Sequence, residues 1–397
     1  MIKIFFNFIL AFGEMLRFLS LPQKKRKIVF YAEDKHSMLH FEPIIKQLAF
    51  IHEETLCYLT SASDDVILET HHNNIIPVYV GDGVVRTLVF SYMAADLLIM
   101  TMPDLETYHI KRSKRYPVHY LYLFHGLVST HYIYRKAAFD SFDTIFCTGP
   151  HQIEEIKATE KLYNLKQKNL VKDGYRPLES LMAEVKEYRK VNKNTNAKKR
   201  PMTVVVAPSW GKNAILETCG LEIVQNLLDS GFRTIVRPHP LTTKYNGWII
   251  KSLSSRFSKN ELFHLNQNLS DKSSLFQSHV MISDWSSIAI EYAFACERPV
   301  IFIDVPMKCN NPEADRINII PLELIIREKI GRVILPDQLD TISEAIEGIY
   351  NDYNEFINII RKLREECVYN LGSSLDGAVN QIMNLSTELQ KNNSQKI

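Results

Sequence analysis

The sequence lacks several signatures that would assign it to a large functional class. It has no G-x-x-x-x-G-K-[ST] or G-x-G-x-x-G motif, so P-loop nucleotide hydrolysis and dinucleotide redox chemistry lose support. The absence of G-x-S-x-G weakens a hydrolase interpretation. Neither H-E-x-x-H nor a C-x-x-C pair occurs, and the 6 cysteines lie far apart, as in proteins with reduced thiols. We therefore expect no disulfide framework, no metal site and no cofactor.

The chain also has little excess charge and no repeats. Its formal net charge is +2, which is too small for a protein that neutralises many phosphates, so we expect no nucleic-acid partner. Hydrophobic residues make up 46% and charged residues 23%, as in ordinary soluble globular proteins. A length of 397 residues is enough for two or three domains, each with its own core.

The N-terminus is almost wholly apolar as far as residue 21. The polar residues that interrupt it fall on one narrow stripe of a helix: Lys3, Asn7, Glu14 and Arg17. Pro22 and a basic cluster at 24–27 follow, so we predict that residues 1–27 lie on the membrane surface, at its cytoplasmic face. Packing on the protein's own core is the alternative. A spanning helix is disfavoured because each charge inside hydrocarbon costs about 2.5–3.5 kcal/mol. We expect no signal peptide, because the segment has no small-residue cleavage site.

From residue 27 onward, short apolar runs alternate with amphipathic stretches, which is the βαβ rhythm of parallel sheets covered on both faces. We predict a membrane-associating helix at 1–24, a Rossmann-like domain at 25–190, a second one at 201–350, and C-terminal helices at 351–397. Residues 182–201 are typical of a polar helix end and a linker. The predicted strands are 28–31, 55–59, 97–100, 120–124 and 144–147, then 203–207, 234–237, 262–265, 280–283 and 300–303. Because ligands bind at the carboxyl ends of such strands, we expect the active site between the domains.

The most informative stretch is 283–292. An apolar strand leads through Asp284 and the serine pair Ser286 and Ser287 into an apolar helix. Free N–H groups and the positive end of the dipole at such a helix start suit a phosphate. Glu291 lies one turn after Ser287 on the same face. Its carboxylate is either an acceptor for ribose hydroxyls or a structural acid paired with a base.

Two histidines follow predicted strands. His125 comes directly after the strand 120–124, and Gly126 lets another group approach closely, so His125 is a candidate general base. The alternative is an imidazole bonded to a loop carbonyl. Arg237 and His239 stand among prolines in a stiff segment, which suits charge on a leaving phosphate but equally a plain turn with a paired arginine.

A third segment, 207–212, also follows a predicted strand. With Ser209 and Lys212 it reads equally well as a loop that contacts phosphate or acceptor and as an ordinary strand-to-helix turn.

Taken in order, these segments resemble the CDP-glycerol glycerophosphotransferases, the polymerases and primases of teichoic acid and related capsule polymers. The resemblance runs from about residue 115 to 305. The matching segments are Phe124-His125-Gly126, Gly174-Tyr175-Arg176-Pro177, Ala207-Pro208-Ser209-Trp210, Arg237-Pro238-His239-Pro240, Ile282-Ser283-Asp284-Trp285-Ser286-Ser287 and Arg298-Pro299-Val300-Ile301-Phe302, with a weaker echo at Leu371-Gly372-Ser373-Ser374.

The resemblance implies a GT-B-like fold, in which two Rossmann-type domains face a cleft, and peripheral membrane binding. It implies that His125 is the catalytic base and His239 a second essential histidine. An acceptor hydroxyl would attack the polyol-bearing phosphorus of a CDP-activated polyol, with CDP-glycerol as the expected donor, and release CMP. The acceptor would be a polysaccharide or a lipid-linked polymer. The predicted donor-binding residues are Arg237, Asp284, Ser286, Ser287, Glu291, Ser209 and Gly126.

The chain departs from the family pattern after Gly126, where it has Leu127-Val128-Ser129-Thr130 in place of Thr-Pro-Leu-Lys, and at Glu291, where the family has Asp. These changes favour a capsule or surface-polysaccharide enzyme. Two other functions remain open from the sequence. One is a GT-B glycosyltransferase that uses a nucleotide sugar, since fold does not determine chemistry. The other is a non-catalytic, membrane-bound scaffold of a polysaccharide assembly complex.

Overall fold

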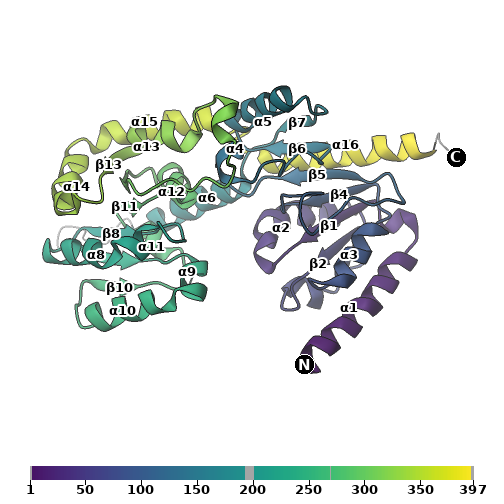
Figure 1. Ribbon diagram of the computed structural model, residues 1–397, viewed down its shortest axis with the longest axis horizontal. Coiled ribbons are helices and arrows are strands. Elements are labelled where there is room, and N and C mark those ends of the chain that lie inside the picture. The colour runs from purple at the N-terminus through teal and green to yellow at the C-terminus, as the bar shows by residue number, and fades with distance from the viewer. Residues whose placement is uncertain (1, 193–200, 269, 395–397) are drawn as a thin grey trace.

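The computed structural model describes residues 2–192, 201–268 and 270–394 (Figure 1). They form two α/β lobes, each built on one all-parallel sheet. The first sheet has 7 strands in the order β3-β2-β1-β4-β5-β6-β7. Its strands are β1 Ile28–Ala32, β2 Leu56–Thr60, β3 Ile75–Tyr79, β4 Leu97–Met100, β5 His119–Leu123, β6 Thr144–Cys147 and β7 Asn169–Lys172.

The second sheet has 6 strands in the order β10-β9-β8-β11-β12-β13. Its strands are β8 Thr203–Val206, β9 Arg233–Val236, β10 Phe263–Leu265, β11 Val280–Ser283, β12 Val300–Ile303 and β13 Gly331–Ile334. The predicted GT-B-like pair of Rossmann-type domains is thereby confirmed.

Helices cover both faces of each sheet. The central strands are mostly apolar, and every residue of β1, β2, β4, β6, β8 and β11 is buried. The helices before the second sheet are α1 Ile2–Ser20, α2 Met38–Lys46, α3 Val84–Ser91, α4 Thr130–Ile133, α5 Pro150–Tyr163 and α6 Arg176–Val191. Those after its first strand are α7 Ile215–Thr218, α8 Gly220–Asp229, α9 Pro240–Tyr245, α10 Gly247–Phe257, α11 Ser273–Gln277, α12 Ser287–Cys296, α13 Leu322–Ile330, α14 Ile342–Asn351, α15 Tyr353–Cys367 and α16 Ser374–Ser394.

The strand order places the site. In the first sheet the order reverses between β1 and β4, and in the second between β8 and β11. Loops that leave the carboxyl ends of such neighbouring strands turn to opposite sides and leave a crevice between them. The loops after β8, β9 and β11 carry the segments that the sequence singled out.

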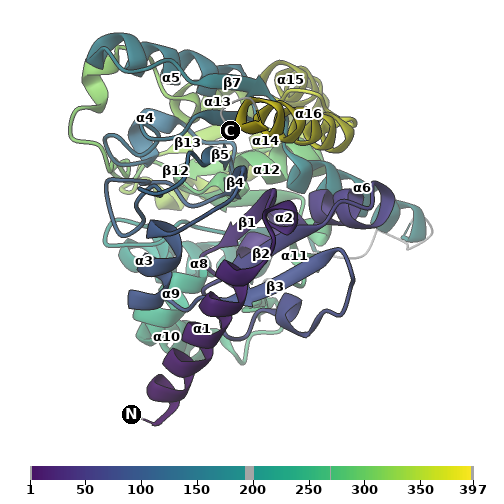
Figure 2. The same ribbon diagram turned by 90° about the vertical axis from the view of Figure 1, so that its right-hand side faces the viewer.

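Helix α1 lies along the first lobe, beside α3 and β3 (Figure 2). One face is buried in the core through Ala11, Met15 and Phe18. Its other face exposes apolar side chains to solvent: Phe6, Phe8, Ile9, Leu10, Phe12 and Leu16. Packing on the core and an exposed apolar face therefore occur in the same helix. Among the residues that the structure describes, no helix has both the length and the hydropathy to cross a membrane.

The two lobes share apolar packing. Leu178, Leu181 and Val185 of α6 lie in one cluster with buried residues of α12 and the second sheet. Helix α16 returns to the first lobe, where Ala378 and Ile382 pack in the same cluster as α2, as the yellow helix beside β4 and β5 shows (Figure 1). Residues 182–191 of the predicted linker region are helical, and 193–200 lie outside the described residues.

Candidate active site

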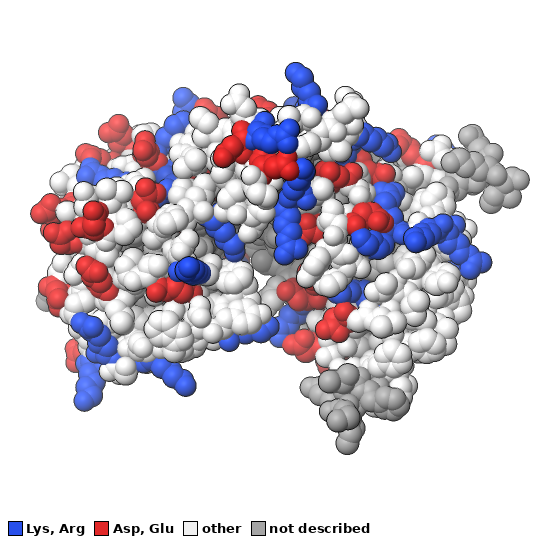
Figure 3. Space-filling view, in the orientation of Figure 1, with Lys and Arg blue, Asp and Glu red and all other residues white. Residues whose placement is uncertain are grey.

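A cavity of about 290 Å³ lies between the lobes, where the molecular surface is hollowed (Figure 3). The second lobe supplies most of its wall from the loops after β8, β9 and β11. The first lobe and α6 close it through Leu39, Pro177 and Leu181. Among the predicted site residues, those that line the cavity are Arg237, His239, Ser286, Ser287 and Glu291. The structure therefore brings five of the nine together in one cavity.

The start of α12 forms one wall. Ser286 is the N-cap residue, with extended backbone, yet its side chain makes no capping hydrogen bond. Ser286 and Ser287 both face the cavity at the positive end of a ten-residue helix. Two hydroxyls beside uncapped N–H groups form a site that can bind the oxygens of a phosphate.

His239 is held in one orientation. Its Nδ1 accepts a hydrogen bond from the Leu241 N–H at 3.1 Å, which caps α9, and its ring stacks on Trp210 with centroids 6.1 Å apart. Burial, together with the positive charge of Lys308, lowers the pKa of His239 to about 4. The ring is therefore neutral near pH 7. Since Nδ1 is the acceptor, Nε2 carries the proton and can donate it in a hydrogen bond.

Arg237 is tied to the loop after β10. Its Nη1 donates to the carbonyl of Asp271 at 2.6 Å, and the side chain is 9% exposed. Burial lowers the pKa of Arg237, and the charge of Asp271 opposes that shift. The guanidinium both lines the cavity and fixes the loop beside it, where Lys272 adds a second cation.

His125 follows β5 in the first lobe, at the edge of the site. Its Nδ1 lies 3.1 Å from the Tyr122 hydroxyl. The residue is exposed, although the rings of His40 and Tyr134 each have their centroids 6.0 Å from that of His125. Desolvation by this surrounding protein lowers the pKa of His125, against a hydrogen bond with the backbone of Thr101. His125 is not in the wall of the cavity itself.

Tyr175 connects His125 to the cavity. Its buried hydroxyl lies 3.2 Å from the carbonyl oxygen of His125 and 3.2 Å from Oε1 of Glu291. Burial raises the pKa of Glu291 to about 7, while the hydrogen bond from Tyr175 and the charge of Lys272 oppose the shift. Both protonation states of Glu291 are therefore accessible near neutral pH.

Three predicted donor-binding residues lie outside the cavity wall. Asp284 is 1% exposed and accepts hydrogen bonds from the N–H groups of Ser209, at 2.7 Å, and Ile215, at 3.1 Å. It supports the loop after β8 from beneath, because its carboxylate is occupied by these two donors. Ser209 lines a neighbouring pocket, and the Gly126 carbonyl accepts from Gln152 at 3.1 Å.

Sequence reasoning missed His40, which lies on α2 with its ring 6.0 Å from that of His125 and 6.3 Å from that of Tyr175. Its Nδ1 is buried and has no hydrogen-bond partner within the part of the chain that the structure describes, and burial lowers its pKa to about 3. The signal that could have found it is topological. His40 follows the central strand β1, next to the reversal of strand order where ligands bind.

Comparison with known families bears on this geometry. The sequence profile of the CDP-glycerol:poly(glycerophosphate) glycerophosphotransferases matches residues 19–308, which include every predicted site residue. This chain belongs to that family. It is therefore a CDP-glycerol glycerophosphotransferase-type enzyme, and the family does not favour the alternative of a nucleotide-sugar glycosyltransferase. No sequence among the curated proteins matches it.

Solved structures show the same fold. The wall teichoic acid polymerase TagF, in a variant soaked with CDPG, has a TM-score of 0.59 at 11% identity over 98% of this chain and 96% of that chain. The UDP-GlcNAc 2-epimerase from Neisseria meningitidis, bound to UDP-GlcNAc, has a TM-score of 0.55 at 12% identity over 90% of this chain and 100% of that chain. At such low sequence identity, these similarities show only that this glycerophosphotransferase shares the fold of those proteins.

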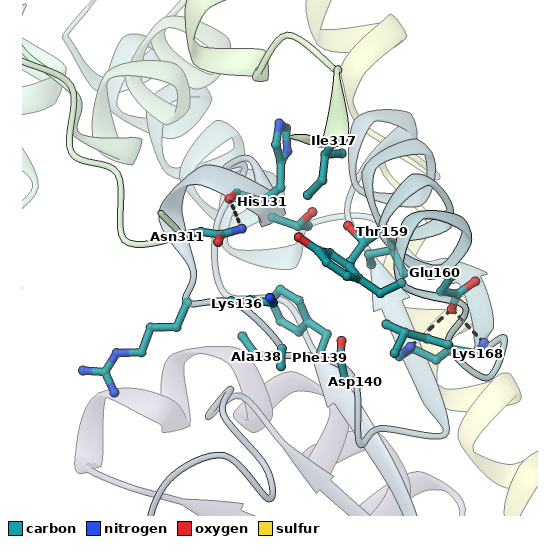
Figure 4. A pocket seen from close by; sticks show the side chains of 16 residues that line it. His131, Lys136, Ala138, Phe139, Asp140, Thr159, Glu160, Lys168, Asn311 and Ile317 are labelled. Atoms are coloured by element: carbon teal, nitrogen blue, oxygen red, sulfur yellow. Dashed lines mark hydrogen bonds and ion pairs between the residues drawn. The ribbon is translucent and has the colours of Figure 1, made fainter. Parts of the chain in front are cut away.

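A seam of buried polar groups joins the lobes beyond His125. The Ser129 N–H donates to Oε1 of Glu323 on α13 at 2.9 Å, and Nδ1 of His131 lies 3.4 Å from Oε2 of Glu155. Beside it lies a second cavity of about 240 Å³, in which Asn311 reaches the His131 carbonyl and Lys168 pairs with Glu160 (Figure 4). Glu160 and Lys168 pair with each other there, and Lys136 pairs with Glu313, so this cavity is less suited to a charged substrate than the cavity at α12.

The seam should make stability depend on pH. Burial raises the pKa of Glu323 from 4.5 to about 7, so the folded protein holds a proton that the unfolded chain releases. Stability from this group is complete below about pH 4.5 and is lost as pH rises through 7, by roughly 3 kcal/mol. The raised pKa of His131 acts in the same direction. We expect urea unfolding to show a fall in stability from pH 5 to pH 8, and Glu323→Gln to flatten it.

The matched control for this prediction is Glu328→Gln on the exposed side of α13. It should leave the pH dependence of the unfolding free energy unchanged. A Glu323→Gln variant with the same slope as the unsubstituted protein would contradict the assignment.

Proposed function

We propose that this enzyme transfers glycerol phosphate from CDP-glycerol to a terminal hydroxyl of a polyol-phosphate polymer and releases CMP. The observation that carries the proposal is the gathering of Arg237, His239, Ser286, Ser287 and Glu291 in one cavity at the carboxyl edge of the second sheet. The departures from the family pattern around Leu127 and Glu291 favour a capsule or related surface polymer as the product.

The donor's diphosphate would lie at the start of α12. There the hydroxyls of Ser286 and Ser287, the helix dipole and the Arg237 guanidinium face one space. Nε2–H of His239 would donate to a phosphate oxygen, where negative charge increases as CMP leaves. Glu291, with its pKa near 7, would face the nucleoside side as an acceptor for hydroxyl groups.

His125 would act as the base. The acceptor oxygen attacks the phosphorus that bears glycerol, its proton passes to His125, and the bond between that phosphorus and the CMP oxygen breaks. Because its pKa is lowered, the ring is unprotonated at neutral pH and can accept that proton. Tyr175 contacts both the His125 carbonyl and Glu291. It would therefore fix the position of His125, in the first lobe, relative to Glu291, in the second.

The experiment is a substrate panel. Purified enzyme is incubated with CDP-glycerol and a poly(glycerol phosphate) acceptor, and CMP release is measured together with polymer growth. CDP-ribitol and UDP-GlcNAc serve as comparison donors. Turnover with CDP-glycerol supports the proposal. Turnover with the sugar nucleotide alone would support a glycosyltransferase, and no turnover with any donor would support a scaffold.

We further propose that the enzyme binds the cytoplasmic face of the membrane peripherally through α1. The exposed stripe that includes Phe8, Ile9, Phe12 and Leu16 supports this, since the surface along α1 carries few charges (Figure 3). The exposed cations Lys24 and Lys25 follow the helix directly and suit anionic lipid.

Replacing Phe8 and Phe12 together by Glu should release the enzyme from anionic vesicles. Each buried aromatic side chain contributes about 1.5–3 kcal/mol, so the partition constant on phosphatidylglycerol vesicles should fall at least about tenfold. Val191→Glu, at an exposed apolar position at the end of α6, is the control and should bind as before. Equal sedimentation of the double variant and the control would refute membrane binding through α1.

A further inference from the structure

A separate pocket of about 200 Å³ lies beside the candidate active site and is lined by two tryptophans and two lysines. Trp210 and Lys212 come from the loop after β8, Trp285 from the loop after β11, and Lys308 from the loop after β12. None of the described residues that line it is acidic. We call this the Trp–Lys pocket.

The Trp–Lys pocket adjoins the reacting groups. Trp210 forms its wall and stacks on His239, which lines the main cavity. Trp285 precedes Ser286, so the same turn serves the pocket on one side and the donor site on the other. A ligand in this pocket therefore ends next to the phosphate that Ser286 and His239 face.

The two ammonium groups of the pocket can pair with an anionic ligand. Nζ of Lys308 stands 4.2 Å from the centroid of the Trp210 ring. Among the residues that the structure describes, neither Lys308 nor Lys212 is within ion-pair distance of a carboxylate. The nearby Asp304 is paired with Arg327 at 2.9 Å, and Asp284 is occupied by backbone donors. Burial lowers the pKa of Lys308, a cost that a bound anion would offset.

The aromatic walls are fixed. Trp285 donates from Nε1 to the Val305 carbonyl at 2.7 Å, and the Arg327 guanidinium covers its ring at 3.9 Å. Rigid indole faces suit the C–H surfaces of a polyol, and the ammonium groups suit phosphate oxygens. A ligand of alternating carbon and phosphate units satisfies both.

The loop that carries Lys308 also leads to the first lobe. The Asn310 N–H donates to the Tyr132 carbonyl at 2.9 Å, on the short helix α4 that follows His125. A chain that leaves the pocket along this loop therefore passes toward the side of the candidate base.

We propose that the Trp–Lys pocket binds a phosphate of the polyol-phosphate acceptor, close to the hydroxyl end that reacts. The inference rests on the proposed function and names the subsite for its second substrate. The competing occupant is the donor's cytosine, which could stack on Trp210. Two lysines that form no ion pair with a carboxylate of the described residues favour the phosphate.

The test is the double variant Lys212→Gln/Lys308→Gln, assayed with two acceptors. One is an oligo(glycerol phosphate) of defined length, and the other is free glycerol, which has no phosphate. We expect KM for the oligomer to rise at least about tenfold, because two charge-assisted contacts are lost. The KM for CDP-glycerol and the turnover of free glycerol should change less than about twofold. Lys251→Gln, an exposed lysine of α10, is the control.

The outcomes separate the two proposals. A rise in KM for CDP-glycerol would overturn the inference and place the nucleotide in this pocket. An unchanged KM for the oligomer, with turnover intact, would also overturn it and leave the proposed function in place. Absence of CDP-glycerol turnover in the unsubstituted enzyme would instead overturn the proposed function.

Discussion

His125→Ala should lower kcat for CMP release by about 10²- to 10⁴-fold, the usual contribution of a general base. The binding of CDP-glycerol should change little, because His125 lies at the edge of the donor cavity and not in its wall. Single-turnover kinetics and donor titration measure the two effects separately. The lowered pKa of His125 also sets the sign of the pH dependence. The active, unprotonated ring persists below pH 6.5, so kcat/KM should decline only at more acidic pH.

His52→Ala is the control for this substitution. His52 is an exposed histidine at the end of the π-helix Gln47–Ile51 in the same lobe. It should retain full activity. If kcat of His125→Ala lies within threefold of kcat of His52→Ala, His125 is not the base, because loss of a base lowers kcat by about 10² or more. Its contact with Tyr122 would then be its role.

His239→Ala should cost about 10²- to 10³-fold in kcat, because it removes a hydrogen-bond donor placed where charge develops. The same change removes the N-cap of α9, worth about 1 kcal/mol of stability. His239→Asn separates the two effects. Its amide oxygen can still accept from the Leu241 N–H, but its shorter side chain does not reach as far as Nε2.

We therefore expect His239→Asn to recover the stability of the unsubstituted enzyme while its kcat stays low. Thermal unfolding and CMP release are the two measurements. Full activity in His239→Asn would show that capping α9 is the whole function of His239.

The interior of both sheets and the edge strand β10 could be predicted from the sequence, but the other three edge strands could not. Runs such as 97–100 and 280–282 are apolar throughout because they are covered on both faces. The sequence pattern did not predict the edge strands β3, β7 and β13. Strand β3 contains Pro77, β7 has only two apolar residues, and β13 begins with Gly331 and Arg332. An edge strand is partly solvated, so its pattern resembles a loop.

The lining of the candidate site could be predicted where a motif lies at the end of a strand, as at His239 and Ser286. The lining could not be predicted where a side chain binds the backbone of a loop and does not face the cavity. Asp284 is adjacent to Trp285 in sequence, yet its carboxylate accepts the Ser209 and Ile215 N–H groups and leaves the cavity. Nor does sequence spacing bring His40 beside His125, since that contact crosses from one strand's loop to another's.

The apolar cluster shared by α6 and α12 sets the boundary at which this enzyme can be recombined with a relative. Helix α6 precedes the second sheet in the chain but packs with it, through Leu178 and Leu181. A chimera joined after α6 would set a foreign helix against α12 and leave mismatched side chains in the shared layer. A junction placed before Tyr175 keeps α6 and α12 from one parent, so the unit of exchange begins one helix earlier than the sheets alone suggest.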